Sequence, residues 1–198
     1  MKALKILVGL LALSILLIIS FNFLLTSDNF FQQQLSKHGS YDRVDNANQI
    51  NKAVLQYLTS ETPSLQVENF NEREETHLSD VKDVFKQLND LMIVAFFLLI
   101  ALIAFLIRKE QSFRNLCFET SKICLIILLV AAIFSIVSFS FLFTSFHQVF
   151  FESGTWLFNN NDLLIKLYPN DFFNDFFQNI LILTVLYNLI LLVASKPK

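Results

Sequence analysis

Glycine, proline and charged side chains are scarce in this sequence. Its 198 residues include 3 glycines and 3 prolines, charged residues make up 16%, and 54% are hydrophobic. This composition, with its positive mean hydropathy, is not that of an ordinary soluble domain. The sequence also lacks a Gly-x-Ser-x-Gly elbow, a His-Glu-x-x-His motif and a phosphate-binding glycine loop. If the protein is an enzyme, we expect its substrate to supply the nucleophile.

The apolar residues gather in four runs without a charged side chain. They span residues 6–25, 91–107, 123–143 and 179–194, and each is near the roughly 20 residues that cross about 30 Å of hydrocarbon as a helix. Buried core helices are the alternative for the shorter runs, but four of them would leave too little polar sequence to cover them. The first run has no small-x-small cleavage site, so we expect a retained anchor. The sequence therefore predicts an all-α membrane protein with four transmembrane helices in a single domain.

Basic residues indicate how the predicted helices are oriented. They lie before the first run, in the connection 108–122 and at the end of the sequence: Lys2, Lys5, Arg108, Lys109, Arg114, Lys122, Lys196 and Lys198. The positive-inside rule makes these regions cytoplasmic, with both termini inside. Segments 26–90 and 144–178 then face outward, and they have no basic surface for nucleic acid. Cys117 and Cys124 lie in or beside the cytoplasmic connection, so we expect reduced thiols.

Contacts between the predicted spans must use residues other than glycine. None of the four runs contains a small-x-x-x-small pair of glycines, which is the common motif for close helix packing in membranes. Polar side chains within the apolar runs can instead bond across helices. Asn22, Thr184 and Asn188 are therefore predicted to form interhelical hydrogen bonds.

The first outer segment is predicted to be helical rather than disordered. Apolar residues recur at helical spacing through residues 50–58, and residues 59–63 then break the pattern. A second helix is expected from Asn71, where Glu74 completes a capping box. Its apolar face suits a helix that lies along the membrane interface, which would place His77 near the lipid headgroups.

The second outer segment is too apolar to lie in water. Its density of aromatic residues is typical of a bilayer interface, and Gly154 and Pro169 mark turns in it. Non-helical backbone at this depth must be covered by protein or line a wet cavity, because unsatisfied backbone groups are costly in lipid. We therefore expect an extracytoplasmic interfacial helical cap with a cavity that is open to lipid.

Histidine is the side chain best suited to proton transfer at neutral pH, and the sequence contains 3. His38 lies in a loop pattern, whereas His77 and His147 lie at the outer ends of membrane elements and are candidates for an acid/base pair. Isolated interfacial histidines are also commonly wetted residues without a catalytic role. A metal site is a weaker alternative, because Glu74 and His77 form a single Glu-x-x-His and the di-iron pattern needs two. We predict neither a metal nor another cofactor.

Three stretches of the sequence carry a resemblance to a known family. They read NEREETHLSDVK at 71–82, FHQVFF at 146–151 followed by Trp156, and DLLIKLYP at 162–169. Together with the order of the four runs, they resemble the bacterial lipoprotein intramolecular transacylase family, Lit. The first stretch departs from the family pattern at Leu78, where relatives are expected to carry Met. The residues before the third stretch lack an expected proline.

The resemblance implies transfer of the sn-2 acyl chain of a diacylglyceryl-cysteine lipoprotein to the α-amine of the same cysteine, which gives a lyso-form lipoprotein. It makes His77 and His147 the catalytic residues. The amine must lose a proton as it attacks, and the departing glyceryl oxygen must gain one, so two histidines suit the reaction. His147 is assigned as the base and His77 as the acid or oxyanion stabiliser. A non-enzymatic scaffold that binds lipid or a partner is the alternative.

The resemblance also implies supporting or substrate-binding roles for Arg73, Asp80, Lys82, Trp156 and Asp162. By residue type alone they could equally be solvated charges and an interfacial anchor. Asp80, three residues from His77 on a helix, is the best candidate to orient its ring. The implied partners are the diacylated lipoprotein and membrane lipids. We expect a monomer in the cell membrane with its active site at the extracellular face.

Overall fold

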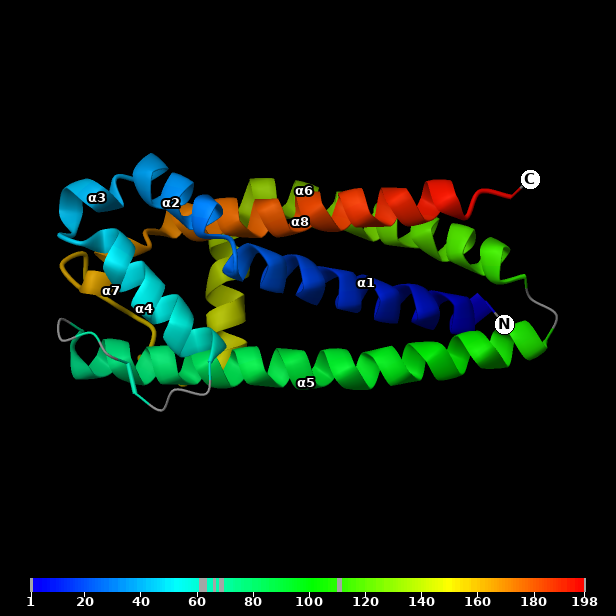
Figure 1. Ribbon diagram of the computed structural model, residues 1–198, viewed down its shortest axis with the longest axis horizontal. Helices are drawn as coiled ribbons and strands as arrows, with labels where there is room; N and C mark the ends of the chain where they lie inside the picture. Colours follow the sequence, from blue (N-terminus) through cyan, green and yellow to red (C-terminus); the bar gives the residue numbers. More distant parts are fainter. Residues whose placement is uncertain (1, 61–63, 66, 68–69, 110–111, 198) are drawn as a thin grey trace. The chain divides into compact units, whose positions relative to one another are not determined.

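The computed structural model of the chain describes residues 2–60, 64, 65, 67, 70–109 and 112–197. Within these residues all regular secondary structure is helical, which confirms the predicted fold class (Figure 1). The helices are α1 (Lys2–Leu25), α2 (Asp28–Lys37), α3 (Ser40–Arg43), α4 (Ala47–Thr59), α5 (Glu72–Arg108), α6 (Phe113–Phe150), α7 (Leu163–Leu167) and α8 (Asn170–Ala194).

Four of these helices, α1, α5, α6 and α8, are long and apolar enough to cross a membrane. Each contains one of the four predicted runs, so the prediction of four spans is confirmed. The helices extend beyond the runs, because a charged side chain ends an apolar run without ending a helix. One result is that α6 already begins at Phe113, within the segment 108–122 that was predicted to be a connection.

The helix α5 replaces two elements that were expected to be separate. The amphipathic helix predicted from Asn71 and the span at 91–107 form one helix of 37 residues. No glycine or proline lies between them to end it. The expectation of a separate helix along the interface is therefore wrong, and His77 stands roughly 20 Å along the α5 axis from the start of the apolar run.

The chain divides into two compact units. The first contains Met1–Asn22, Leu88–Val137 and Gln178–Lys198, and the second contains Phe23–Gln87 and Ser138–Phe177. The first unit holds the most apolar stretches of the four long helices. The second holds α2, α3, α4 and α7 together with the remaining ends of the long helices.

Polar side chains join the helices of the first unit in pairs. Three hydrogen bonds of 2.9 Å link Asn22 to Asn89, Ser20 to Thr184, and Asn188 to the Ser121 carbonyl. The predicted interhelical bonds of Asn22, Thr184 and Asn188 are thus confirmed. The outer faces are apolar instead: Ile136 and Val137 are 75% and 76% exposed, as suits side chains in contact with lipid.

The second unit has its own core of leucine and aromatic side chains. Leu35 of α2 and Leu167 of α7 are fully buried, and the Phe31 ring packs 5.8 Å from that of Phe172 in α8. A buried hydrogen bond of 2.8 Å runs from the Tyr168 hydroxyl to Asn51 of α4. The predicted helix at 50–58 is confirmed as part of α4. The break after it is confirmed at Ser60, while residues 61–63 lie outside the described residues.

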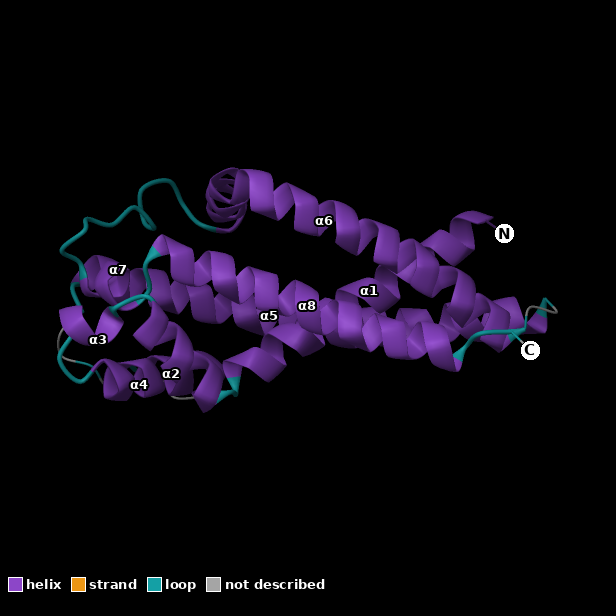
Figure 2. Ribbon diagram, turned by 90° about the horizontal axis from the view of Figure 1, so that it is seen from above, coloured by secondary structure: helices purple, strands orange, loops and turns teal. Residues whose placement is uncertain are grey.

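The predicted turns at Gly154 and Pro169 are also found. Gly154 has a φ of 92°, a conformation that side-chain-bearing residues rarely adopt, and it lies in the loop between α6 and α7 (Figure 2). Pro169 directly precedes α8, where its missing N–H removes no helical hydrogen bond. The short helices α2, α3 and α7 were not predicted.

Candidate active site

The second unit brings His77 of α5 and His147 of α6 side by side. Their ring centroids are 5.9 Å apart and their planes differ by 23°. The two side chains are buried, at 8% and 9% exposed. His38 is engaged elsewhere, because its Nε2 lies 2.9 Å from Asp175 in α8. The geometry therefore singles out two of the three histidines.

The position of His77 follows from the way in which α5 begins. The Asn71 side chain accepts a hydrogen bond from the Glu74 amide, and the Glu74 carboxylate accepts one from the Asn71 amide. This is the predicted capping box, and it is confirmed. His77 follows one turn further along the same helix, so its backbone is fixed by the cap.

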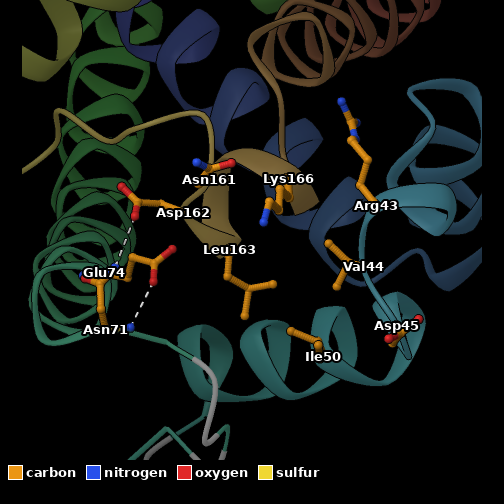
Figure 3. A pocket seen from close by; sticks show the side chains of 10 residues that line it. All are labelled: Arg43, Val44, Asp45, Ile50, Asn71, Glu74, Asn161, Asp162, Leu163 and Lys166. Atoms are coloured by element: carbon orange, nitrogen blue, oxygen red, sulfur yellow. Dashed lines mark hydrogen bonds between the residues drawn. The ribbon is translucent and has the colours of Figure 1, made fainter.

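Glu74 also has a second function that the sequence did not indicate. Its other carboxylate oxygen accepts a hydrogen bond of 2.7 Å from the Leu164 amide, at the start of α7. The side chain is only 1% exposed. A single buried carboxylate therefore caps two helices and ties α7 to the first turn of α5. Figure 3 shows Glu74 beside Asn71, with Leu163 near it.

The position of His147 depends on the last part of α6. The helix contains a non-helical residue, Ser138, with φ −142° and ψ 37°. Beyond it, Phe139, Phe143 and His147 recur every four residues and so share one face. The Phe143 ring packs 5.4 Å from Phe173 of α8. This aromatic packing fixes the helix segment that carries His147.

The tautomer of His147 is set by its own helix. Its Nδ1 lies 2.7 Å from the carbonyl oxygen of Phe143. Because a carbonyl oxygen only accepts hydrogen bonds, Nδ1 must carry the proton. The other ring nitrogen, Nε2, then keeps its lone pair and can accept a proton from a substrate.

Aromatic rings surround the histidine pair. Phe151 and Phe158 contact the His77 ring at 4.8 and 5.4 Å, and Phe143 and Trp156 contact the His147 ring at 4.1 and 4.9 Å. Such an enclosure disfavours the charged imidazolium form of either histidine.

The pKa values of both histidines follow from this enclosure. Both lie outside the apolar runs 91–107 and 123–143. Burial, followed by the charge of His147, lowers the pKa of His77 from 6.5 to about 4. Burial also lowers the pKa of His147, although its hydrogen bond to Phe143 opposes the shift. Both rings are therefore neutral at pH 7 and can accept protons.

Two buried nitrogen atoms at this site have no hydrogen-bond partner in the described part of the chain. They are Nδ1 of His77 and Nε1 of Trp156. Buried polar atoms in proteins are nearly always paired, and exceptions commonly mark a function or a missing ligand. These two atoms are available to form further hydrogen bonds.

Two of the predicted supporting residues hold the loop that carries Trp156. Arg73 donates a hydrogen bond of 3.2 Å to the carbonyl of Leu157, the residue after Trp156. Asp162 accepts one of 2.6 Å from the Asn159 amide. The structure therefore places Arg73 and Asp162 in contact with the backbone of this loop.

The contacts of Asp80 and Lys82 differ from those of Arg73 and Asp162. No hydrogen bond between Asp80 and His77 is found among the described residues, and the role of Asp80 in orienting this ring stays a prediction. Burial and the charges of Asp83 and Glu152 raise the pKa of Asp80. The Lys82 amino group lies 4.3 Å from the centre of the Tyr57 ring, a cation–π contact between α5 and α4.

A polar cavity of about 330 Å³ also lies in the second unit (Figure 3). Its lining consists of Arg43, Val44, Asp45, Ile50, Asn71, Glu74, Asn161, Asp162, Leu163 and Lys166. Neither histidine lines it. In Figure 3 the amino group of Lys166 lies among these residues, while the guanidinium group of Arg43 points away from them. In the described part of the chain, including this cavity, no three His, Cys, Asp or Glu side chains are grouped as metal ligands.

Fold and site together define an all-helical membrane protein with four candidate spans and a buried histidine pair. The family model described as lipoprotein intramolecular transacylase Lit matches residues 1–173. No curated protein matches the sequence. The chain thus belongs to the lipoprotein intramolecular transacylase family, Lit, which confirms the predicted family. It is an enzyme that transfers acyl groups, so the scaffold alternative is set aside.

Solved structures share the fold at low sequence identity. The in meso structure of the membrane integral lipoprotein intramolecular transacylase Lit from Bacillus cereus has a TM-score of 0.81 at 14% identity, covering 98% of this chain and 93% of that chain. A histidine-to-alanine variant of that protein gives 0.80 at 13%, with 98% and 91% covered. These likenesses concern the fold, which agrees with the predicted multi-pass membrane protein.

Proposed function

We propose that this protein moves the sn-2 acyl chain of a diacylglyceryl-cysteine lipoprotein to the α-amine of the same cysteine, with His77 and His147 as its acid/base pair. The observation that carries the proposal is the stacking of two buried imidazole rings at 5.9 Å within an aromatic enclosure. Membership of the family supports the general reaction. The geometry of the pair supports the assignment of these two residues.

The number of protons that the reaction must move explains why two histidines are used. An α-amine has a pKa of about 7.7 to 8.0, so at neutral pH the substrate arrives mostly as an ammonium ion. That ion must lose two protons to become an amide nitrogen. The glyceryl oxygen takes up one of them as it leaves, and the other goes to water. Two neutral imidazoles can accept both protons.

His147 is proposed as the base that acts during attack. Its Nδ1 proton is committed to the Phe143 carbonyl, which leaves Nε2 as the acceptor. As the amine nitrogen bonds to the ester carbon, Nε2 takes a proton from that nitrogen and later releases it to water. The lowered pKa of His147 favours this release.

His77 is proposed to carry the second proton. It takes a proton from the ammonium ion, which frees the amine for attack, and gives it to the glyceryl oxygen as the C–O bond breaks. With a pKa of about 4, the His77 imidazolium is a strong acid toward a departing alkoxide. Since amine and ester belong to one molecule, attack needs no acyl-enzyme intermediate and gains from their proximity.

The site is proposed to lie at the extracytoplasmic side of the cell membrane. Segments 26–90 and 144–178 hold both histidines, and the positive-inside rule directs them outward. Both termini are then cytoplasmic, and the four long helices with their connections act as one transmembrane domain. The diacylated lipoprotein would be anchored in the same outer leaflet, so enzyme and substrate meet in the membrane. We propose that the protein acts as a monomer.

Replacement of single histidines tests the proposal. We expect His77→Ala and His147→Ala to lower the rate of acyl transfer by at least about 10²-fold, because each removes one proton carrier. His38→Gln is the matched control, since His38 bonds to Asp175 and not to the pair. Mass spectrometry of the lipoprotein's N-terminal peptide measures the lyso-form, and circular dichroism verifies the helices. Wild-type product from either alanine variant would contradict the proposal.

A further inference from the structure

The indole N–H of Trp156 is a buried donor without an acceptor. Its Nε1 has no hydrogen-bond partner in the described part of the chain. An indole nitrogen can only donate, so no rotation or tautomer of the ring resolves this deficit. A Trp that merely anchors the protein at the interface keeps its N–H toward water or headgroups. A buried, unpaired N–H is instead free to donate to an acceptor on a bound molecule.

The position of this donor is fixed by the loop between α6 and α7. Next to Trp156, the Thr155 amide donates to the Glu152 carbonyl at 3.2 Å, and the Leu157 carbonyl accepts from Arg73. Asp162 ties down the far end of the loop through the Asn159 amide. The indole is therefore held before the substrate binds, as required of a group that stabilises a transition state.

The donor also lies beside the proposed base. The Trp156 and His147 ring centroids are 4.9 Å apart, and their planes differ by 40°. The two rings therefore line the same part of the site. Nearby cations are engaged elsewhere, because Arg73 bonds to the Leu157 carbonyl and Lys82 lies over Tyr57.

We propose that the Trp156 indole N–H is the oxyanion donor of the reaction, and thus a catalytic residue. This inference rests on the proposed function. When the amine nitrogen bonds to the sn-2 ester carbon, the carbonyl π electrons move to the oxygen, which becomes negatively charged and accepts the indole hydrogen bond. The carbonyl re-forms as the bond to the glyceryl oxygen breaks. The indole keeps its proton throughout, so the two histidines carry all proton transfer.

A neutral donor suits this enclosure. Phe143, Phe151 and Phe158 surround the histidines, and a cation placed among them without a partner would lose its hydration. A preorganised N–H carries no such cost. Its hydrogen bond to the ester oxygen strengthens as negative charge develops on that oxygen. The donor therefore stabilises the transition state more than the bound ester. The expected effect of its loss is therefore on kcat more than on KM.

The sequence contains a single Trp, which allows a one-atom test. Growth of a tryptophan auxotroph on β-(3-benzothienyl)alanine replaces the indole N–H by sulfur at position 156 alone and preserves the bicyclic shape. We expect kcat to fall by about 10²- to 10³-fold while KM changes by less than about threefold. A kcat within about threefold of the wild type, in folded protein, would overturn the proposal.

A second variant tests the proposal if the tryptophan analogue is poorly incorporated or if the protein that contains it does not fold. Trp156→Phe retains an aromatic ring and lacks a donor, so it is expected to show the same loss of kcat. A Trp156→Phe protein with wild-type kcat would equally overturn the inference. Control substitutions separate the two proposals. Activity in His77→Ala or His147→Ala would defeat the proposed function, whereas inactive histidine variants beside an active Trp156→Phe would defeat only the oxyanion role.

Discussion

The two units of the chain differ in how completely their buried polar side chains are paired. In the first unit, the polar side chains of Asn22, Thr184 and Asn188 are each hydrogen-bonded to a neighbouring helix. In the second unit Glu74 and Asn51 are also hydrogen-bonded, but four side-chain atoms are buried without a partner among the described residues: Nδ1 of His77, Nε1 of Trp156, and the side-chain oxygens of Asn48 and Asn174. In the proposed mechanism, the unpaired nitrogen atoms of His77 and Trp156 bind the substrate, whereas the paired side chains of the first unit hold helices together. Each of the following predictions tests this contrast.

The largest effect is expected from the histidine pair. Since both residues serve one proton-transfer sequence, a double variant, His77→Gln with His147→Gln, should lose little more activity than the worse single variant, a loss of about 10²- to 10⁴-fold. Steady-state assays of lyso-form production measure it, with the melting temperature recorded in parallel. Losses that multiply across the two sites would show that the histidines act independently.

The next largest effect is expected at Glu74, the residue that connects the site to its scaffold. Glu74→Ala leaves the Asn71 and Leu164 amides without their charged acceptor, which should lower the free energy of unfolding by about 3–4 kcal/mol. Activity should fall with it. Glu75→Ala is the control, because Glu75 is exposed on the same turn. Thermal unfolding in detergent measures the change, and equal stability of the two variants would contradict the double cap.

The lowered pKa of His77 predicts a dependence of stability on pH. Between pH 6.5 and about 4 the unfolded chain takes up a proton at this residue and the folded chain does not. Stability should therefore fall as pH falls through this window, by up to about 3 kcal/mol from this group, and should level off below it. His77→Gln should show a shallower fall in melting temperature than the wild type. Identical slopes would mean that His77 is not buried in its neutral form.

The smallest effect is expected in the first unit. Asn188→Leu removes the bond to the Ser121 carbonyl and should cost about 1 kcal/mol, since hydrogen bonds between membrane helices are individually weak. The kcat should not change. Ile190→Leu, at a position that is 66% exposed, is the matched control. A marked loss of kcat in Asn188→Leu would contradict the assignment of catalysis to the second unit alone.

Features that depend on local sequence were predictable. Charge-free runs located the four long helices, and the spacing of Asn71 and Glu74 indicated the capping box. A separate interfacial helix was wrongly predicted, because an amphipathic pattern looks the same on a helix against lipid and on one packed against protein. No helix-breaking residue separated that pattern from the apolar run at 91–107. The absence of such a residue was the available signal for one continuous helix.

Features that depend on contacts between distant residues were not predictable. The bond from the Leu164 amide to Glu74 joins residues that are 90 positions apart, and Arg73 is 84 positions from the Leu157 carbonyl that it holds. Neither pairing leaves a trace in spacing or composition.

The central claim is that two neutral imidazoles exchange protons with the amine and the ester of one lipoprotein molecule. Single-turnover acyl transfer in liposomes, with excess His147→Ala enzyme and a purified diacylated lipoprotein, tests it most directly. The account predicts that no lyso-form accumulates on the timescale over which wild-type enzyme converts all of the substrate. Conversion by folded His147→Ala enzyme at the wild-type rate would contradict it.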